Sequence, residues 1–402
     1  MLWYAVFILK TEIKAMKNEK REKNATWFSR EKRGLLLLLA AALLFAAARL
    51  WLGGGTEKEA PSGDYAEYEK GVVLEVLSDS SVRDEASDGA WRGEQLLTVE
   101  VQTGQYVGKT LLVSNYIGPL YGVPLQSGDS AALIVNTYSN GELRATVYEY
   151  NRIPALLGLL AAFVLITALV GGRTGLKSLI GLGLTVAVLF WVLIPLLLRG
   201  APTLPTVFAC CVYITAVAFT ILGGLHRKTV CAMLGTVAGV ALALLFGLAA
   251  QSLARIDGLR ITDAEALLQL RQSGTPIGLR YLLVGGIAIS ALGAVMDVAM
   301  SISSALEELH AANPAYGMKE LFRSGMNIGR DMVGTMTNTL ILAFLGSGFT
   351  MIIYLYSLGL SRYQLLPSAY VAIELISGLA SSIGMILAIP LTALIGAKMN
   401  AK

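Results

Sequence analysis

Charged residues are scarce in this sequence. Only 15% of its 402 residues are Asp, Glu, Lys or Arg, whereas 55% are hydrophobic. A soluble globular domain carries about 25% charged residues, so a bilayer rather than water is expected to be the main solvent of this chain. The formal net charge of +4 is too small to indicate a nucleic acid partner. The composition therefore predicts an α-helical integral membrane protein.

Residues that hold metals or perform catalysis are also few. The three cysteines, Cys210, Cys211 and Cys231, lie in or beside apolar runs without a CxxC spacing, and we interpret them as buried thiols. The two histidines, His226 and His310, have no second ligand at metal spacing. No nucleophile with a nearby base, P-loop or glycine-rich phosphate cradle is present. We expect no metal, no cofactor and no enzymatic activity.

Long apolar runs are the main feature that the sequence does have. A run of about 20 residues is long enough to span a bilayer as a helix. Such runs predict about eight transmembrane helices, at residues 35–52, 153–170, 176–198, 202–222, 229–250, 280–304, 331–358 and 368–397. The last seven form a predicted membrane domain over residues 153–397.

Basic residues predict the orientation of these helices. If the helices alternate in direction, the basic tail 1–34, the pairs Arg173 with Lys177 and Arg227 with Lys228, and the C-terminal segment 398–402 all lie on one side. By the positive-inside rule that side is the cytoplasm, so both termini are expected there. Translation can start at Met1 or at Met16. Residues 35–52 are interpreted as a signal anchor, although Ala46-Ala47-Ala48 resembles a cleavage site.

The segment 53–152 has a different character and is expected outside the cytoplasm. Turn residues separate short alternating or β-branched runs, which predict five strands at residues 72–77, 96–103, 110–114, 131–137 and 143–150. Five short strands suggest a small all-β barrel such as the OB type. No basic aromatic stripe is present, so a protein or small ligand is a better expectation than nucleic acid.

Polar residues recur at helical spacing in the last three predicted helices. Together with glycines on the same faces, they are Ser290, Gly293, Asp297, Ser301 and Ser304 on 280–304; Asp331, Thr335, Asn338 and Thr339 on 331–358; and Tyr370, Glu374, Ser377, Ser381 and Gly384 on 368–397. Close helix packing explains many small and hydroxyl residues. Asp297 is different, because an ionised carboxylate inside hydrocarbon costs at least ~2.5 kcal/mol and usually faces water or a partner.

The depth of these residues limits which of them can meet. Asp297 and Asn338 are each expected ~10 Å below the cytoplasmic boundary, so they can lie close together. Glu374 is expected roughly 20 Å from Asp297 along the membrane normal, which disfavours a catalytic pair of acids. Asp331 suits a helix N-terminus, and Glu374 suits either an interfacial position or the path itself.

Three blocks of the C-terminal third resemble the signature of the YibE/F-like family of bacterial multi-pass membrane proteins. They are residues 293–301 (GAVMDVAMS), 325–331 (GMNIGRD) and 334–343 (GTMTNTLILA), with a further likeness at 382–384 and 388–393. A weaker likeness extends to Gly108-Lys109-Thr110. The resemblance implies a multi-pass membrane protein and does not imply a particular activity.

Two hypotheses follow for the function. The first is a permease or ion-coupled transporter for an unknown small solute or ion, with a polar path among the last three helices centred on Asp297 and Asn338 and including Ser301, Thr335 and Thr339. The second is a membrane scaffold that transports nothing and binds a protein partner through its outer β domain.

Overall fold

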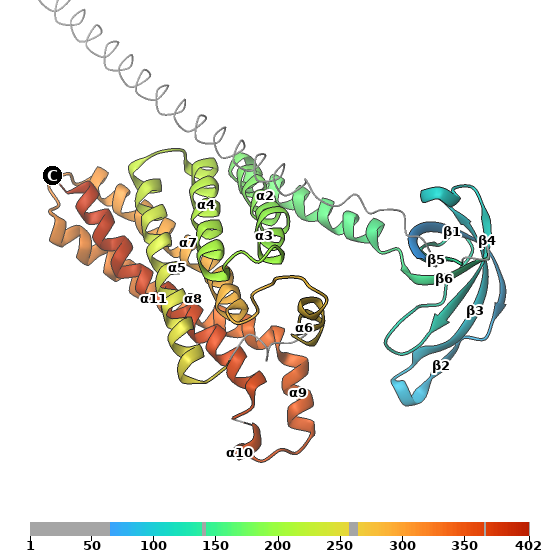
Figure 1. Cartoon of the computed structure of the whole chain (residues 1–402). Coiled ribbons are helices and arrows are strands. Elements are labelled where there is room, and N and C mark those ends of the chain that lie inside the picture. Colours follow the sequence, from blue (N-terminus) through green and yellow to red (C-terminus); the bar gives the residue numbers. More distant parts are fainter. Residues whose placement is uncertain (1–64, 139–141, 257–263, 366, 402) are drawn as a thin grey trace, which may run out of the picture. The chain divides into compact units, whose positions relative to one another are not determined.

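The computed structural model describes residues 65–138, 142–256, 264–365 and 367–401, and these fall into two compact units. The first unit covers residues 65–170 and the second residues 171–401. The predicted tail 1–34 and the first predicted span 35–52 lie outside the described residues. Both units are shown in Figure 1.

The first unit contains a closed five-stranded β-barrel. Its strands are β1 (Tyr65–Asp79), β3 (Ala90–Val101), β4 (Thr110–Ile117), β5 (Ser130–Thr137) and β6 (Leu143–Tyr150), and β2 (Val82–Asp84) extends the edge of β3. Neighbouring strands pair in the order β1-β3-β4-β6-β5, and β5 pairs again with β1. The β4–β6 pair is parallel and the others are antiparallel. All five predicted strands are confirmed, and the strand order is that of an OB-type barrel.

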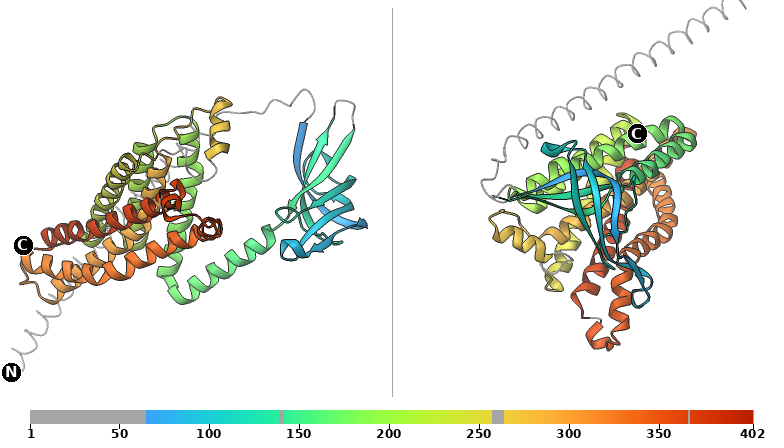
Figure 2. Two further views of the ribbon diagram at one scale, coloured as in Figure 1. Left: turned by 90° about the horizontal axis from the view of Figure 1, so that it is seen from below. Right: turned by 90° about the vertical axis from the view of Figure 1, so that its right-hand side faces the viewer.

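Alternating side chains fill the interior of this barrel. On β5, Ala131, Leu133 and Val135 point inward and are fully buried, because successive side chains of a strand face opposite sides. They pack with Leu97 and Val99 of β3 and with other apolar residues of the barrel core. Figure 2 shows the strands curving around this core.

A buried amide pair ties the barrel to the loop before β5. The Asn115 side chain donates to Gln95 Oε1 at 2.9 Å, and the Leu125 backbone N–H donates to the same oxygen at 2.8 Å. Gln95 Nε2 in turn donates to Asp79 Oδ2 at 2.8 Å. Hydrogen bonds from Ser81, and to a smaller extent from Gln95, hold the pKa of Asp79 below its ordinary value.

The helix after the barrel begins in the first unit and continues into the second. Helix α2 (Ile153–Val188) is interrupted at Gly172, whose φ of 53° is left-handed, and a π-helical turn (Leu189–Leu193) connects it to α3 (Ile194–Leu198). The two spans predicted at 153–170 and 176–198 therefore meet at one kinked glycine rather than at a loop. Glycine suits this position because it has no Cβ to clash at positive φ.

The second unit is a helix bundle. Its long helices are α4 (Thr203–Gly223), α5 (Arg227–Leu253), α7 (Leu282–Ala312), α8 (Met318–Ser347) and α11 (Ala369–Asn400). Three short helices, α6 (Ala264–Gln272), α9 (Phe349–Ser357) and α10 (Arg362–Leu365), connect them. Helices α5, α7 and α11 pack mutually, with α8 against α7 and α11 and with α4 against α5 and α7 (Figure 1).

Several of these helices have the length and composition of membrane spans. Among the described residues, five helical segments are long and apolar enough to cross a bilayer, and α8 with α9 gives a sixth if the bent pair is one span. This result is consistent with a membrane protein and leaves the predicted number of eight spans open. The predicted buried state of the three cysteines is confirmed, since all three are buried free thiols.

The structure differs from the single span predicted at 331–358. Helix α8 begins earlier, at Met318, and runs through residue 331 without a break. Gly325 and Gly329 in this earlier part let α8 pack closely on α11 and α7. The break lies instead at Gly348, where α9 bends away from α8 by 60°.

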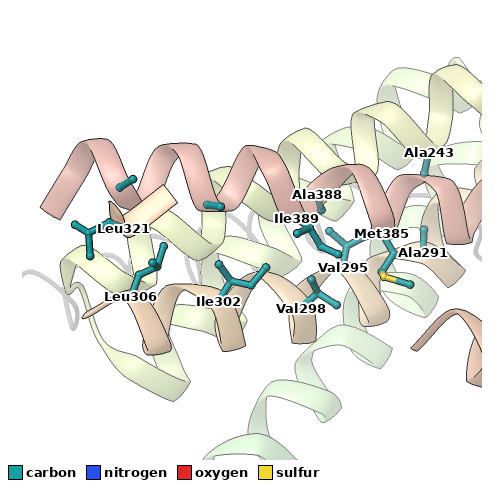
Figure 3. Close-up of a cluster of buried hydrophobic side chains, with 12 residues drawn as sticks. Ala243, Ala291, Val295, Val298, Ile302, Leu306, Leu321, Met385, Ala388 and Ile389 are labelled. Atoms are coloured by element: carbon teal, nitrogen blue, oxygen red, sulfur yellow. The ribbon is translucent and has the colours of Figure 1, made fainter. Parts of the chain in front are cut away.

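The core of the bundle is made of small and branched side chains from four helices. Ala243 of α5, Val295 and Ile302 of α7, Leu321 of α8 and Met385 of α11 are all buried (Figure 3). At several crossings glycine brings two helices into direct contact. A Cβ added to Gly384 would lie 2.5 Å from the Cβ of Ala243. Helices α5 and α11 are thus packed at backbone distance, and Val295 of α7 reaches the same crossing at Gly239 with its side chain.

Candidate functional site

The predicted polar residues of α7 lie together on one face, and that face points away from the bundle core. Ser290, Gly293, Asp297 and Ser301 are all exposed in this chain, while the intervening residues are largely buried. A Cβ added to Gly293 would meet no atom within 4 Å. Ser290 lies at the border of this face, where its hydroxyl is 3.0 Å from that of Ser381 on α11. The stripe is therefore a surface and not a close helix contact.

Helix α8 presents a similar exposed polar face. Asp331, Thr335, Asn338 and Thr339 are exposed on it. Thr335 and Thr339 donate their hydroxyl protons to backbone carbonyls of α8 itself, at 3.2 and 2.9 Å. The amide of Asn338 and the carboxylates of Asp331 and Asp297 make no hydrogen bond or ion pair with the part of the chain that the structure describes. These three groups are available to water or to a ligand.

The register of the two helices places Asp297 near the polar residues of α8. A side chain at Gly325 would contact Leu306, and one at Gly329 would contact Ile302 within 3.4 Å. Because the helices are antiparallel, Asp297 falls at about the level of Gly334 and Thr335, with Asn338 one turn further along α8. We name the exposed polar residues of α7 and α8, from Ser290 to Ser301 and from Asp331 to Thr339, the α7/α8 polar face.

Glu374 belongs to a separate site at the break between α8 and α9. It is half-buried in a cavity of about 680 Å³, which is lined by residues 341–355 of α8 and α9 and by residues 370–379 of α11. A Cβ added to Gly348 would lie 3.4 Å from Glu374 Cγ, so this acid sits directly against the helix break. The cavity has the size of an ordinary small-molecule site. Glu374 is thus neither a partner of Asp297 nor a residue of the α7/α8 polar face.

Sequence reasoning identified Glu374 but missed the cavity around it. The interpretation of 331–358 as one straight span concealed the bend, which lies where Gly346-Ser347-Gly348 places two glycines within the apolar run. The aromatic wall of Phe344, Tyr354 and Tyr370 has no periodic signal of its own, because its members come from three different helices.

The chain matches one protein family by sequence. The family model described as YibE/F-like protein matches residues 159–402, which include both the α7/α8 polar face and the Glu374 cavity. The barrel strands precede the matched range. Comparisons with curated proteins and with solved structures return no match. Because the match covers more than half of the sequence, the chain belongs to the YibE/F-like protein family.

Proposed function

We propose that this protein is a membrane permease in which the α7/α8 polar face lines the path of a small solute or ion. The observation that carries the proposal is Asp297, an acid without a partner among the described residues, on the exposed face of an otherwise apolar helix. Facing lipid, an ionised Asp at the centre of a span would cost at least ~2.5 kcal/mol. An aqueous path removes that cost.

The neighbouring side chains support the same function. Asn338 offers both a donor and an acceptor near Asp297, and Ser301 and Thr335 add hydroxyl oxygens. On α2 before Gly172, by contrast, the exposed residues are apolar, and Leu159 is 70% exposed and Leu169 is 74% exposed. The polar exposure on α7 and α8 differs from that of this apolar helix, which favours a local path along them.

The basic segments support a location in the bacterial cytoplasmic membrane. Arg227 and Lys228 begin α5, Lys319 begins α8 and Lys398 lies in the last turn of α11. In this proposal all of them are cytoplasmic, in line with the positive-inside rule, and the barrel is on the opposite side. Asp297 is then closer to the cytoplasm and Glu374 is closer to the outside.

Removal of the charge at Asp297 is expected to abolish transport without unfolding the protein. Asp297→Asn keeps the size of the side chain and removes its charge, so flux should fall to background. Proteoliposomes with an internal pH dye and a panel of added Na⁺, K⁺ and organic cations provide the measurement. Glu308→Gln is the matched control, since Glu308 lies three turns along the same exposed face of α7 near the end of the helix. Wild-type flux in a folded Asp297→Asn protein would refute the proposal.

A second candidate function is supported by the barrel surface. Tyr68 and Tyr148 are 65% and 58% exposed, and their rings meet edge to face at a centroid distance of 5.2 Å. Exposed tyrosines are typical of protein contact sites. The barrel is then a binding module that holds a partner protein at the membrane.

We expect the double variant Tyr68→Ser/Tyr148→Ser to lose this partner. Crosslinking in intact membranes should give an adduct of the wild type and of Asp297→Asn that the double variant lacks. Tyr121→Ser is the control, because Tyr121 is also exposed, at 63%, but lies on a loop away from the tyrosine pair. An adduct that persists in the double variant, or that never forms with the wild type, would exclude this role for the tyrosines.

A further inference from the structure

The cavity at the break between α8 and α9 has one charge and an otherwise apolar wall. Of the described residues that line it, only Glu374 carries a formal charge. Most of the others are Leu, Ile, Val, Met, Phe and Tyr, and the lining hydroxyls belong to Ser347, Thr350, Tyr354 and Tyr370. A ligand that fits this cavity needs a large apolar body and a single positive centre.

The carboxylate of Glu374 has no partner within the described chain. No hydrogen bond or ion pair joins it to a described residue, and the lining contains no Lys, Arg or His. A carboxylate that is half withdrawn from water loses hydration, and a bound cation restores the lost interaction. An anion would be repelled here, and a second positive charge would be unpaired.

The residues that line the cavity also favour an organic cation over a metal ion. Mg²⁺ and Ca²⁺ need several oxygen ligands, whereas this cavity offers one carboxylate. Phe344, Tyr354 and Tyr370 instead offer aromatic faces, which attract organic cations within about 6 Å of the ring centre. Met351 adds a flexible apolar side chain that can adapt to different shapes.

Glu374 is placed so that a bound cation would lie at the break between α8 and α9. The acid lies against Gly348, where α8 ends and α9 turns by 60°. Substrate sites of secondary transporters are commonly built at helices that are broken in this way. A cation bound at Glu374 would touch both segments of the broken pair and α11.

We infer that the Glu374 cavity binds a lipophilic organic cation of single positive charge. The inference rests on the proposed permease function in that it supplies the class of substrate. Glu374 forms the ion pair with the cationic centre, and the aromatic and aliphatic wall covers the apolar body. Size and charge set the selectivity, because Glu374 is the one charged residue of the described lining and most of the remaining residues are apolar.

Equilibrium binding of radiolabelled tetraphenylphosphonium to the purified full chain in detergent tests this inference. The wild type should bind it saturably, and Glu374→Gln should bind it roughly tenfold more weakly or worse, because loss of the ion pair removes about 1.4 kcal/mol or more. Glu374→Asp retains the charge and should retain measurable binding. Glu308→Gln, which changes an exposed acid outside the cavity, should match the wild type.

A second variant tests the same inference in case Glu374→Gln misfolds. Thr350→Trp places a bulky ring in the cavity while keeping the acid, and it should also lose binding. Size-exclusion profiles show whether each variant is folded. Equal binding by the wild type and by folded Glu374→Gln would overturn the inference and indicate a groove for lipid or detergent tails.

Asp297→Asn separates this inference from the proposed function. It should bind tetraphenylphosphonium like the wild type while losing flux. Normal flux in Asp297→Asn together with Glu374-dependent binding would reject the permease path and leave the cation site standing. Absence of binding in the wild type, together with Asp297-dependent flux of another solute, would reject the cation site alone.

Discussion

Gly384→Ala should destabilise the helix bundle by about 1–3 kcal/mol or more, the usual cost of adding atoms to a filled core. The new Cβ would lie 2.5 Å from Ala243 Cβ, 3.0 Å from Ala243 Cα and 3.1 Å from its backbone nitrogen. Two of these three atoms are backbone, so no side-chain rotation relieves the clash and α11 has to move away from α5. Thermal unfolding in detergent, followed by helical circular dichroism, measures the loss.

Gly286→Ala is the control for this prediction. Gly286 lies in the neighbouring helix α7, and a Cβ added there would meet no atom within 4 Å. Alanine in an open helical position gains about 0.5–1 kcal/mol over glycine, so this variant should be as stable as the wild type or slightly more stable. If both variants melt at the same temperature, the close crossing of α5 and α11 is not present in solution.

Gln95→Leu should destabilise the barrel by about 3 kcal/mol or more, since each buried polar group that loses its partner costs about 1–3 kcal/mol. Gln95 is 1% exposed, and its Oε1 accepts hydrogen bonds from Asn115 Nδ2 and from the Leu125 N–H. Leucine fills a similar volume but accepts neither bond, so the Leu125 N–H is left without a partner inside the barrel. Rapid proteolysis of the loop before β5 and an early β-sheet melting transition are the expected results.

Gln102→Leu is the matched control in the same domain. Gln102 follows β3 and is exposed. A substitution at such a surface position should change stability by no more than about 0.5 kcal/mol. Equal effects of the two glutamine substitutions would show that the amide pair does not stabilise the barrel.

The elements that could be predicted from the sequence are those with a local pattern. The end of β3 alternates, with Thr98 and Glu100 between apolar residues, and the apolar residues Leu97, Val99 and Val101 form its buried face. The spacing of Ser290, Gly293, Asp297 and Ser301 correctly indicates one face of α7. On α11, the predicted series includes Ser377, Ser381 and Gly384, which are all buried against neighbouring helices.

The sequence did not predict which face of each helix packs against another helix and which face is exposed. The series on α7 and the series on α11 look alike in the sequence, yet the first is exposed and the second is packed. The close crossings also use Gly235, Gly239 and Gly329. Gly235 and Gly239 are four residues apart, as are Gly325 and Gly329, which is typical of close helix packing, but this spacing does not say which helix each pair meets. The bend at Gly348 was also missed, because membrane helices tolerate glycine and its presence alone does not identify a break.

The glycine crossing of α5 and α11 has a consequence for movement at the Glu374 cavity. Helices packed at backbone distance cannot slide past one another without losing those contacts. Helix α9 has a single buried residue, Leu355, and is joined to α8 through Gly348. We therefore expect any change in the volume of the cavity to come from rotation of α9 about Gly348, with α5 and α11 fixed.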